Sequence, residues 1–209
     1  MLTVKNLSPS TYLLRLERKD LAFNAGQCFN LGLSSSGVNR EYSIYSGEKD
    51  LYLDFLIKEV PGGIVSPALR RLGKKEEINL HGPYGSFVLD KNSVKNKHFT
   101  FVATGTGIAP FHSFIRSYPE LNYQIVNGIR CLSERYNYES YHPSKITTCV
   151  SREKWEGFNG RVTAYFNKTK INSQSIFYLC GNQKMIQETY DLLRKSNVSG
   201  NQIFTEAFF

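Results

Sequence analysis

The sequence predicts two domains, an antiparallel β-barrel followed by an α/β domain with a parallel sheet. In the first half, short runs of strand-forming residues are separated by turn residues, which is typical of small barrels. In the second half, strand-like runs alternate with helix-like runs, which indicates a parallel sheet. Between the halves, residues 91–97 are rich in Lys, Asn and Ser, as domain boundaries often are. We therefore place the domains at residues 1–94 and 95–209.

The elements of the first domain follow from residue type. Its strand-like runs are Tyr12–Leu16, Leu31–Leu33 and Leu51–Ile57, and a helix-like segment covers Ser66–Leu72. Turns are expected at Asp20, at Asn24–Gly26 and at Gly82–Pro83.

The second domain begins with an apolar run that reads as a strand. The strands expected here are Phe99–Ala103, Tyr123–Gly128, Ile146–Val150 and Ser175–Leu179. Helices are expected over Pro110–Arg116 and, most clearly, over Lys184–Lys195.

Two segments of the first domain predict a site for a flat ring carrying a pyrophosphate. In the extended run Arg40–Ser43, the Arg40 guanidinium and the Tyr42 ring share one face. Glycines at 62 and 63 then lead into the helix-like segment, whose free N–H groups and positive dipole end suit a phosphate. A planar bidentate cation, a stacking ring and a helix N-terminus together fit a flavin dinucleotide, FAD. The chemistry would then be electron transfer.

A second nucleotide site is predicted after the first strand of the α/β domain. Thr104-Gly105-Thr106-Gly107 follows that strand and precedes a helix, so its glycines allow the backbone to approach a pyrophosphate. Pro110 stands where the full dinucleotide fingerprint has its last glycine. A purely structural turn is the alternative.

Ser151-Arg152 follows the strand at Ile146–Val150, and residues just past such strands line the ligand crevice. A hydroxyl beside a guanidinium suits the ribose 2′-phosphate that separates NADP from NAD. Arg161 is the second candidate contact and Arg130 the third. Ordinary solvated arginines are the alternative interpretation.

The last motifs surround the chain's end. Cys180-Gly181-Asn182 ends an apolar strand, where small residues let a planar ring lie close to the backbone, unless Cys180 simply fills core space. The segment Glu206–Phe209 closes with two aromatic rings, which either complete the core as a last strand or cover something flat.

Composition narrows the class of protein. With 209 residues, a net charge of +8 and a pI near 9.3, the chain favours an acidic partner or ligand. Its four cysteines are scattered, so we expect no iron–sulfur cluster or zinc site and no bound metal. No signal sequence or membrane-spanning apolar run is seen, which favours a cytoplasmic monomer without membrane insertion. Nucleic-acid binding is disfavoured because basic and aromatic residues do not alternate.

Taken in order, these motifs resemble the ferredoxin/flavodoxin–NADP⁺ reductase family, and most closely its bacterial branch. The likeness spans essentially the whole chain and rests on seven motifs: Arg40–Ser43, Gly63–Ser66, Gly82–Phe87, Thr104–Pro110, Val150–Glu153, Cys180–Asn182 and Glu206–Phe209.

The resemblance implies specific roles for these residues. Arg40 would contact the FAD pyrophosphate, Tyr42 would pack against the flavin ring, and Ser43 would lie near flavin N5. The turn Gly63-Ile64-Val65-Ser66 would hold the pyrophosphate, with Ser66 as hydroxyl donor.

By the same resemblance, Thr104 to Gly107 would bind the NADP(H) pyrophosphate, and Ser151 and Arg152 the 2′-phosphate. Phe208 would cover the flavin and Phe209 would extend toward the adenine.

The implied reaction is hydride transfer between NADP(H) and FAD, coupled to single-electron exchange with an acidic ferredoxin or flavodoxin. Ser43, Cys180, Glu206 and Phe208 are the candidate catalytic residues. Two alternatives stay open: the reductase component of an oxygenase system with a separate ferredoxin, and a flavin-binding electron-transfer subunit without independent turnover.

Overall fold

The computed structural model describes residues 3–33, 37–73 and 76–208. The chain divides into two compact units. The first comprises Met1–Leu89 and Ala109–Pro119, and the second comprises Asp90–Ile108 and Glu120–Phe209. Helix α2 (Ala109–Ser117), which follows the first strand of the α/β sheet in sequence, therefore packs with the first unit. The predicted sequence of antiparallel strands followed by a parallel sheet with helices is confirmed.

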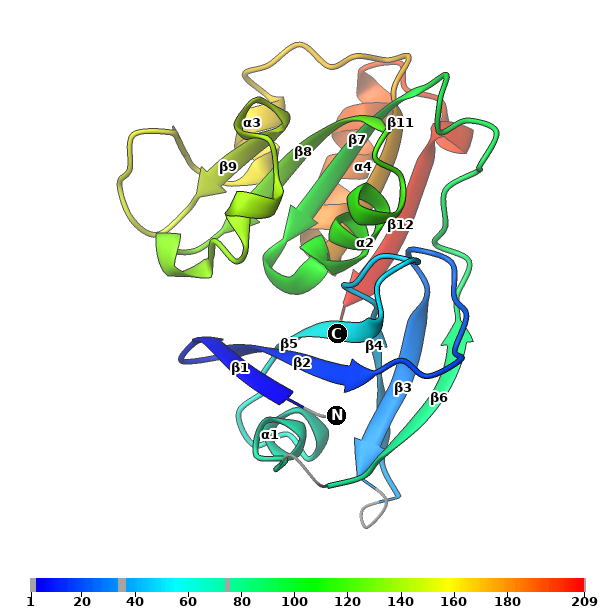
Figure 1. The fold of residues 1–209 in the computed structure, drawn as a ribbon. Coiled ribbons are helices and arrows are strands. Elements are labelled where there is room, and N and C mark those ends of the chain that lie inside the picture. Colours follow the sequence, from blue (N-terminus) through cyan, green and yellow to red (C-terminus); the bar gives the residue numbers. More distant parts are fainter. Residues whose placement is uncertain (1–2, 34–36, 74–75, 209) are drawn as a thin grey trace. The chain divides into compact units, whose positions relative to one another are not determined.

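The first unit contains two three-stranded antiparallel sheets, ordered β1-β2-β5 and β4-β3-β6. An isolated bridge between Ile44 and Phe55 links the two sheets. The elements are β1 (Thr3–Ser8), β2 (Thr11–Glu17), β3 (Cys28–Leu33), β4 (Asn39–Ser43), β5 (Tyr52–Lys58), α1 (Val65–Arg70) and β6 (Ile78–Tyr84) (Figure 1).

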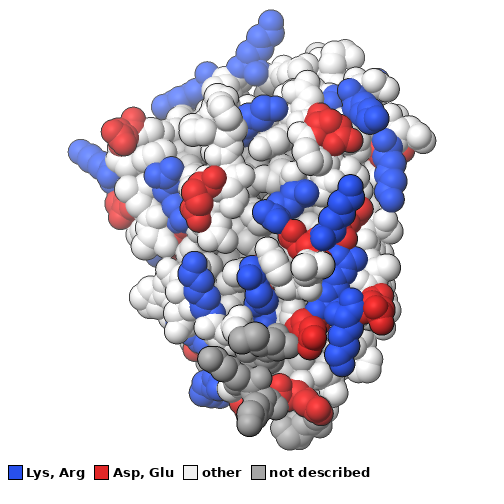
Figure 2. Space-filling model, in the orientation of Figure 1, with Lys and Arg blue, Asp and Glu red and all other residues white. Residues whose placement is uncertain are grey.

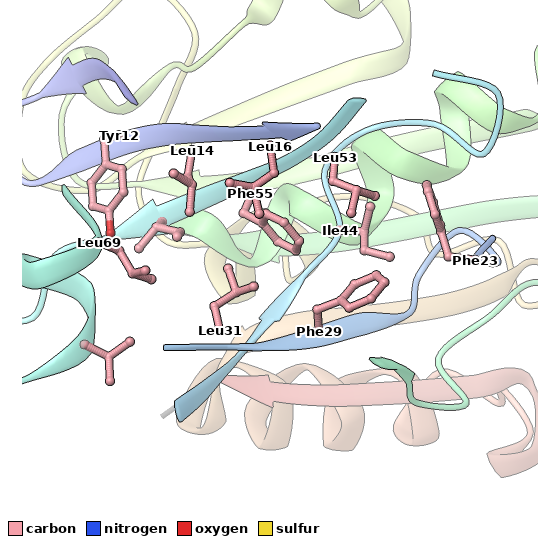
Figure 3. Close-up of a cluster of buried hydrophobic side chains, with 12 residues drawn as sticks. Tyr12, Leu14, Leu16, Phe23, Phe29, Leu31, Ile44, Leu53, Phe55 and Leu69 are labelled. Carbon is pink, nitrogen blue, oxygen red and sulfur yellow. The ribbon is translucent and has the colours of Figure 1, made fainter. Parts of the chain in front are cut away.

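Apolar side chains on alternate residues of β2 and β5 form the core between these sheets. Tyr12, Leu14 and Leu16 point to one face of β2, because side chains in a strand repeat every two residues. They meet Phe29 and Leu31 of β3 across the core (Figure 3). Burial of these apolar side chains is the main source of stability for the unit.

Gly82–Pro83 does not form the expected turn but lies inside strand β6, joined by a cis peptide bond. Gly82 has a φ of +146°, and a Cβ there would lie 2.7 Å from Cδ1 of Phe29, so only glycine fits. Because β6 is an edge strand, the missing N–H of Pro83 leaves no partner strand unsatisfied.

The second unit is built on a six-stranded parallel sheet of order β10-β9-β8-β7-β11-β12. Its strands are β7 (His98–Thr104), β8 (Asn122–Ile129), β9 (Ile146–Val150), β10 (Phe158–Asn159), β11 (Ile176–Asn182) and β12 (Ile203–Phe208). The chain runs outward from β7 to β10 and then returns to β11, so the order reverses between β7 and β11. Ligands of such sheets bind at the carboxyl ends of the strands around this reversal.

Helices α3 (Val162–Phe166) and α4 (Gln183–Lys195) lie on one face of this sheet (Figure 1). Apolar side chains of both helices and of the strands beneath them form one core cluster. Asn182 caps α4 by accepting a hydrogen bond from the Met185 N–H. Short 3₁₀ turns complete the chain at Gly105–Ile108, Leu132–Glu134, Tyr138–Ser140, Pro143–Lys145 and Gly200–Gln202.

Candidate functional site

In the first unit, strand β4 carries the residues predicted to bind the flavin ring. The Arg40 side chain is exposed, and its Nη1 donates to the Asn39 carbonyl oxygen at 2.8 Å. Tyr42 is half-buried and packs against the core, and this burial raises its pKa to about 12. Ser43, which pairs with Cys28 in the register of β4 and β3, is buried. The strand thus presents a cation at its exposed end and a neutral, fixed aromatic ring beside it.

The glycine turn before α1 retains backbone donors for an anion. Gly62 has a φ of +73° with open space around it, and no side chain caps the helix at Ile64. Uncapped N–H groups at a helix start suit a phosphate. The Ser66 hydroxyl accepts from the Val60 N–H at 2.9 Å, which fixes the turn. A hydroxyl that accepts one hydrogen bond still has its proton to donate, so Ser66 fits the predicted role as well.

Arg70 of α1 makes hydrogen bonds that hold the first unit together. Its guanidinium donates to Asn6 Oδ1, to the carbonyl oxygens of Ser8 and Pro9, and to Glu59 Oε2, at 2.7 to 3.1 Å. These contacts hold α1 against the turn between β1 and β2. The neighbouring Arg71 is exposed, and Lys74 and Lys75 lie outside the described residues.

In the second unit, the glycine turn after β7 packs directly against the end of β11. A Cβ on Gly107 would lie 2.7 Å from the Cα of Gly181, and one on Gly181 would lie 2.8 Å from the Thr104 carbonyl oxygen. The Thr104 hydroxyl accepts from the Asn182 N–H at 3.0 Å. Gly107 and Gly181 are therefore required by contact between two backbone segments.

Gly105 differs from these two glycines. It has a φ of +56°, and nothing lies within 4 Å of where its Cβ would stand. Gly105 therefore leaves open space directly after the carboxyl end of β7, the edge at which ligands of such sheets bind.

Cys180 and Glu206 stand opposite one another in the register of β11 and β12. The Cys180 Sγ donates to Glu206 Oε2 at 3.8 Å. Burial, followed by the neighbouring carboxylate, raises the pKa of the Cys180 thiol well above its usual value, so the thiol stays neutral. Phe208 is half-buried at the end of β12, in register with Asn182, and Phe209 lies outside the described residues.

Three arginines follow the adjacent carboxyl ends of β8, β9 and β10. Ile129 pairs with Val150, and Val150 pairs with Asn159, so the residues that follow these strands are neighbours. Those residues are Arg130, Ser151 with Arg152, and Arg161 after Gly160. All three arginine side chains are exposed. The Ser151 hydroxyl donates to the Ile129 carbonyl oxygen at 3.1 Å.

Sequence patterns gave no indication of the contacts that shape this edge. The Arg130 N–H donates to Glu134 Oε2 at 2.8 Å, and the Leu132 N–H donates to Glu153 Oε1. The Arg135 guanidinium lies 4.3 Å from the centre of the Tyr138 ring. The only sequence signal was the presence of acidic residues near the predicted strand ends, which is too common to interpret.

Within residues 3–33, 37–73 and 76–208, no group of three His, Cys, Asp or Glu side chains is placed to hold a metal ion. No helix in the same ranges is long and apolar enough to cross a bilayer.

On the face shown in Figure 2, Lys and Arg are interspersed with Asp and Glu.

Comparison with known proteins matches both halves of the chain. Residues 2–89 match the model of the oxidoreductase FAD-binding domain, and residues 101–191 match that of the oxidoreductase NAD-binding domain. The flavodoxin/ferredoxin–NADP reductase of Escherichia coli is 30% identical over 89% of this chain and 85% of its own length. The chain belongs to the ferredoxin/flavodoxin–NADP⁺ reductase family. It carries an oxidoreductase FAD-binding domain and an oxidoreductase NAD-binding domain.

Other relatives extend this picture. The electron transfer component of toluate 1,2-dioxygenase from Pseudomonas putida is 29% identical over 98% of the chain, but the chain spans only 65% of that protein. In fold, the chain resembles a ferredoxin NADP⁺ reductase from Neisseria gonorrhoeae solved with FAD and NADP. That likeness has a TM-score of 0.85 at 21% identity and covers 100% of this chain and 96% of the other.

Proposed function

We propose that the protein transfers a hydride between NADP(H) and bound FAD and passes single electrons between FAD and a separate ferredoxin or flavodoxin. The observation that carries the proposal lies at the carboxyl ends of β7, β11 and β12. There the turn Thr104–Gly107 meets the strand that carries Cys180, and Glu206 faces Cys180 across the register. Membership of the ferredoxin/flavodoxin–NADP⁺ reductase family supports hydride and electron transfer as the class of reaction.

FAD is assigned to the first unit because the residues present fit it. Arg40 and the uncapped turn from Gly63 to Ser66 would hold its pyrophosphate, and Tyr42 its ring. Ile64 and Val65 belong to the same turn. When bound, FAD supplies the conversion between two-electron and one-electron transfer. We assign Ser43 and Glu206 to hydrogen bonding and proton supply near flavin N5.

NADP(H) is assigned to the second unit. The backbone of Thr104, Gly105, Thr106 and Gly107 would hold its pyrophosphate. The 2′-phosphate would be bound by Ser151, Arg152 and Arg161. Guanidinium groups are suited to this role because they bind phosphate oxygens in pairs.

The neutral Cys180 thiol places no negative charge on the wall of the nicotinamide pocket, and it donates a hydrogen bond to Glu206. We assign Phe208 to covering the flavin ring until the nicotinamide displaces it. The role of Phe209, toward the adenine, stays a prediction.

Anaerobic mixing of the FAD-loaded protein with NADPH and with NADH tests the reaction directly. We expect bleaching of the flavin absorbance, faster with NADPH, and reduction of an artificial acceptor with turnover. Arg152→Ala should remove at least about tenfold of the preference for NADPH, because one charged phosphate contact is worth about 1.5–3 kcal/mol. Failure to oxidise either nucleotide would instead favour a flavin-binding subunit without independent turnover.

An oxygenase reductase component is the second candidate, favoured by the likeness to the toluate dioxygenase protein over 98% of the chain. The chemistry is the same and the electron recipient differs. Reduction of a panel of ferredoxins and flavodoxins separates the two. A preference for an oxygenase-linked ferredoxin would replace the main proposal.

We further propose an acidic carrier partner and a cytoplasmic monomer with domains 1–94 and 95–209. The net charge of +8 supports the acidic partner, since opposite charges speed encounter. Electron transfer to ferredoxin should then slow as salt is added. Light scattering tests the monomer, and limited proteolysis tests the domain boundary.

A further inference from the structure

The strand-end loops that carry Arg130 and Arg152 are fastened together by hydrogen bonds. The Ser151 N–H donates to the Ile129 carbonyl oxygen at 3.1 Å, and the Arg152 N–H donates to the Arg130 carbonyl oxygen at 2.9 Å. These two bonds continue the pairing of β8 with β9 beyond the strands. They fix the backbone at Arg130 and Arg152 but do not hold the segment that follows Arg130.

Glu153 holds that segment. Its Oε1 accepts from the Leu132 N–H, twenty-one residues back along the chain. Glu153 is therefore the residue next to Arg152 whose side chain reaches across to the residues just after Arg130. Its carboxylate binds this backbone N–H, while the neighbouring Arg152 is exposed.

The rest of the loop after β9 is rigidly built. The Asn159 Nδ2 donates to the carbonyl oxygens of Trp155 and Gly157 at 2.8 and 2.9 Å. The Trp155 Nε1 donates to the Phe158 carbonyl oxygen at 3.0 Å. The loop that carries Glu153 is therefore cross-linked by hydrogen bonds two to six residues further along, between Trp155 and Asn159.

We propose that Glu153 is a positioning residue for recognition of the 2′-phosphate, which it serves by holding the segment after Arg130 against the loop that carries Arg152. The inference rests on the proposed preference for NADP(H). A carboxylate near an anion site weakens anion binding by its charge, so the benefit of Glu153 must come from its acceptor oxygen. The charge of Glu153 and its hydrogen bond therefore have opposite effects on anion binding, and variants that remove one or both distinguish them.

The test is calorimetric titration of the FAD-loaded protein with 2′-phospho-AMP and with AMP, which needs no turnover. Glu153→Ala loses the acceptor, and we expect it to bind 2′-phospho-AMP about tenfold more weakly, equivalent to about 1.4 kcal/mol. Glu153→Gln keeps an acceptor oxygen and loses the charge, so it should bind at least as tightly as the wild type. AMP binding should be unchanged in both.

Glu156→Ala is the matched control, because it removes the same charge from the same exposed loop. It should not weaken 2′-phospho-AMP binding. Amide hydrogen exchange supplies an independent readout: exchange at Leu132 should speed up in Glu153→Ala and not in Glu153→Gln.

The outcomes separate the two ideas. If the wild type binds AMP and 2′-phospho-AMP equally, the proposed NADP(H) preference fails. If the wild type prefers 2′-phospho-AMP and Glu153→Ala keeps that preference, the positioning role fails. Equal weakening of both ligands, or weakening in Glu153→Gln that matches Glu153→Ala, would also overturn it.

Discussion

The His112 imidazole lies flat against the Tyr45 ring, with ring centroids 3.7 Å apart and planes within 4° of parallel. Its Nδ1 is 2.7 Å from the Tyr45 carbonyl oxygen, so Nδ1 carries the proton and donates it. Beside it, the Ser113 hydroxyl donates to the Ser46 carbonyl oxygen at 2.7 Å. These contacts fasten α2 to the segment that directly follows strand β4.

Burial of His112 makes stability depend on pH. Desolvation lowers its pKa from 6.5 to about 4, so the folded protein holds it neutral. As pH falls below 6.5, the unfolded chain takes up this proton first, and the free energy of unfolding decreases by up to about 3 kcal/mol by pH 4. His112→Gln should flatten this part of the profile in urea titrations. His81→Gln, at an exposed position, should not; an unchanged slope in His112→Gln would contradict the assignment.

Gly107→Ala should destabilise the second unit and weaken NADP(H) binding. Its new methyl group would lie 2.7 Å from the Gly181 Cα, which forces the glycine turn away from β11. Such overpacking costs about 1–3 kcal/mol. Gly200→Ala is the control, since the nearest atom to its Cβ is 3.5 Å away. Thermal unfolding and nucleotide titration measure both effects, and equal behaviour of the two variants would refute the close-approach argument.

Phe208→Ala should tighten binding of NADP⁺, because the nicotinamide would no longer compete with an aromatic ring for the flavin. We expect a severalfold decrease in Kd, measured by difference absorbance of the flavin. Phe204→Ala in the same strand removes a ring that stacks on Tyr178 at 4.7 Å, so it controls for loss of an aromatic side chain. Unchanged affinity in Phe208→Ala would argue against a covering role.

Arg70 and Arg71 are adjacent basic residues at the end of α1, so comparing them separates a role in folding from a role in docking an acidic electron carrier. Arg70→Ala removes hydrogen bonds to Asn6, Ser8, Pro9 and Glu59, and it should lower the free energy of unfolding by about 2–4 kcal/mol. Arg71→Ala should leave stability within about 0.5 kcal/mol, as for most exposed positions. If Arg70→Ala instead left stability unchanged and slowed ferredoxin reduction at low salt, a docking role would be the better interpretation.

Periodicity was a good guide where one face of an element is buried. The strand at Ile146–Val150 was predicted with its observed bounds, and the helix at Lys184–Lys195 begins one residue earlier, at Gln183. Patterns failed for short or irregular elements. Strand β10 has two residues, and β6 contains Gly82–Pro83, whose residue types predict a turn. The positive φ of Gly82 and its close contact with Phe29 explain the glycine there, and both belong to the tertiary structure.

The sequence alone predicted the order of the two architectures and the family, because these depend on residue types at short spacing along the chain. The two nucleotide sites stay predictions. The tertiary structure decided which residues meet. Parallel register placed Arg130, Arg152 and Arg161 at one edge and set Cys180 opposite Glu206. It also showed that the Arg70 side chain makes hydrogen bonds within the first unit and that the Glu153 carboxylate accepts from the Leu132 N–H. Such pairings join residues far apart in the chain, and their partners are chosen by packing, which no local pattern encodes.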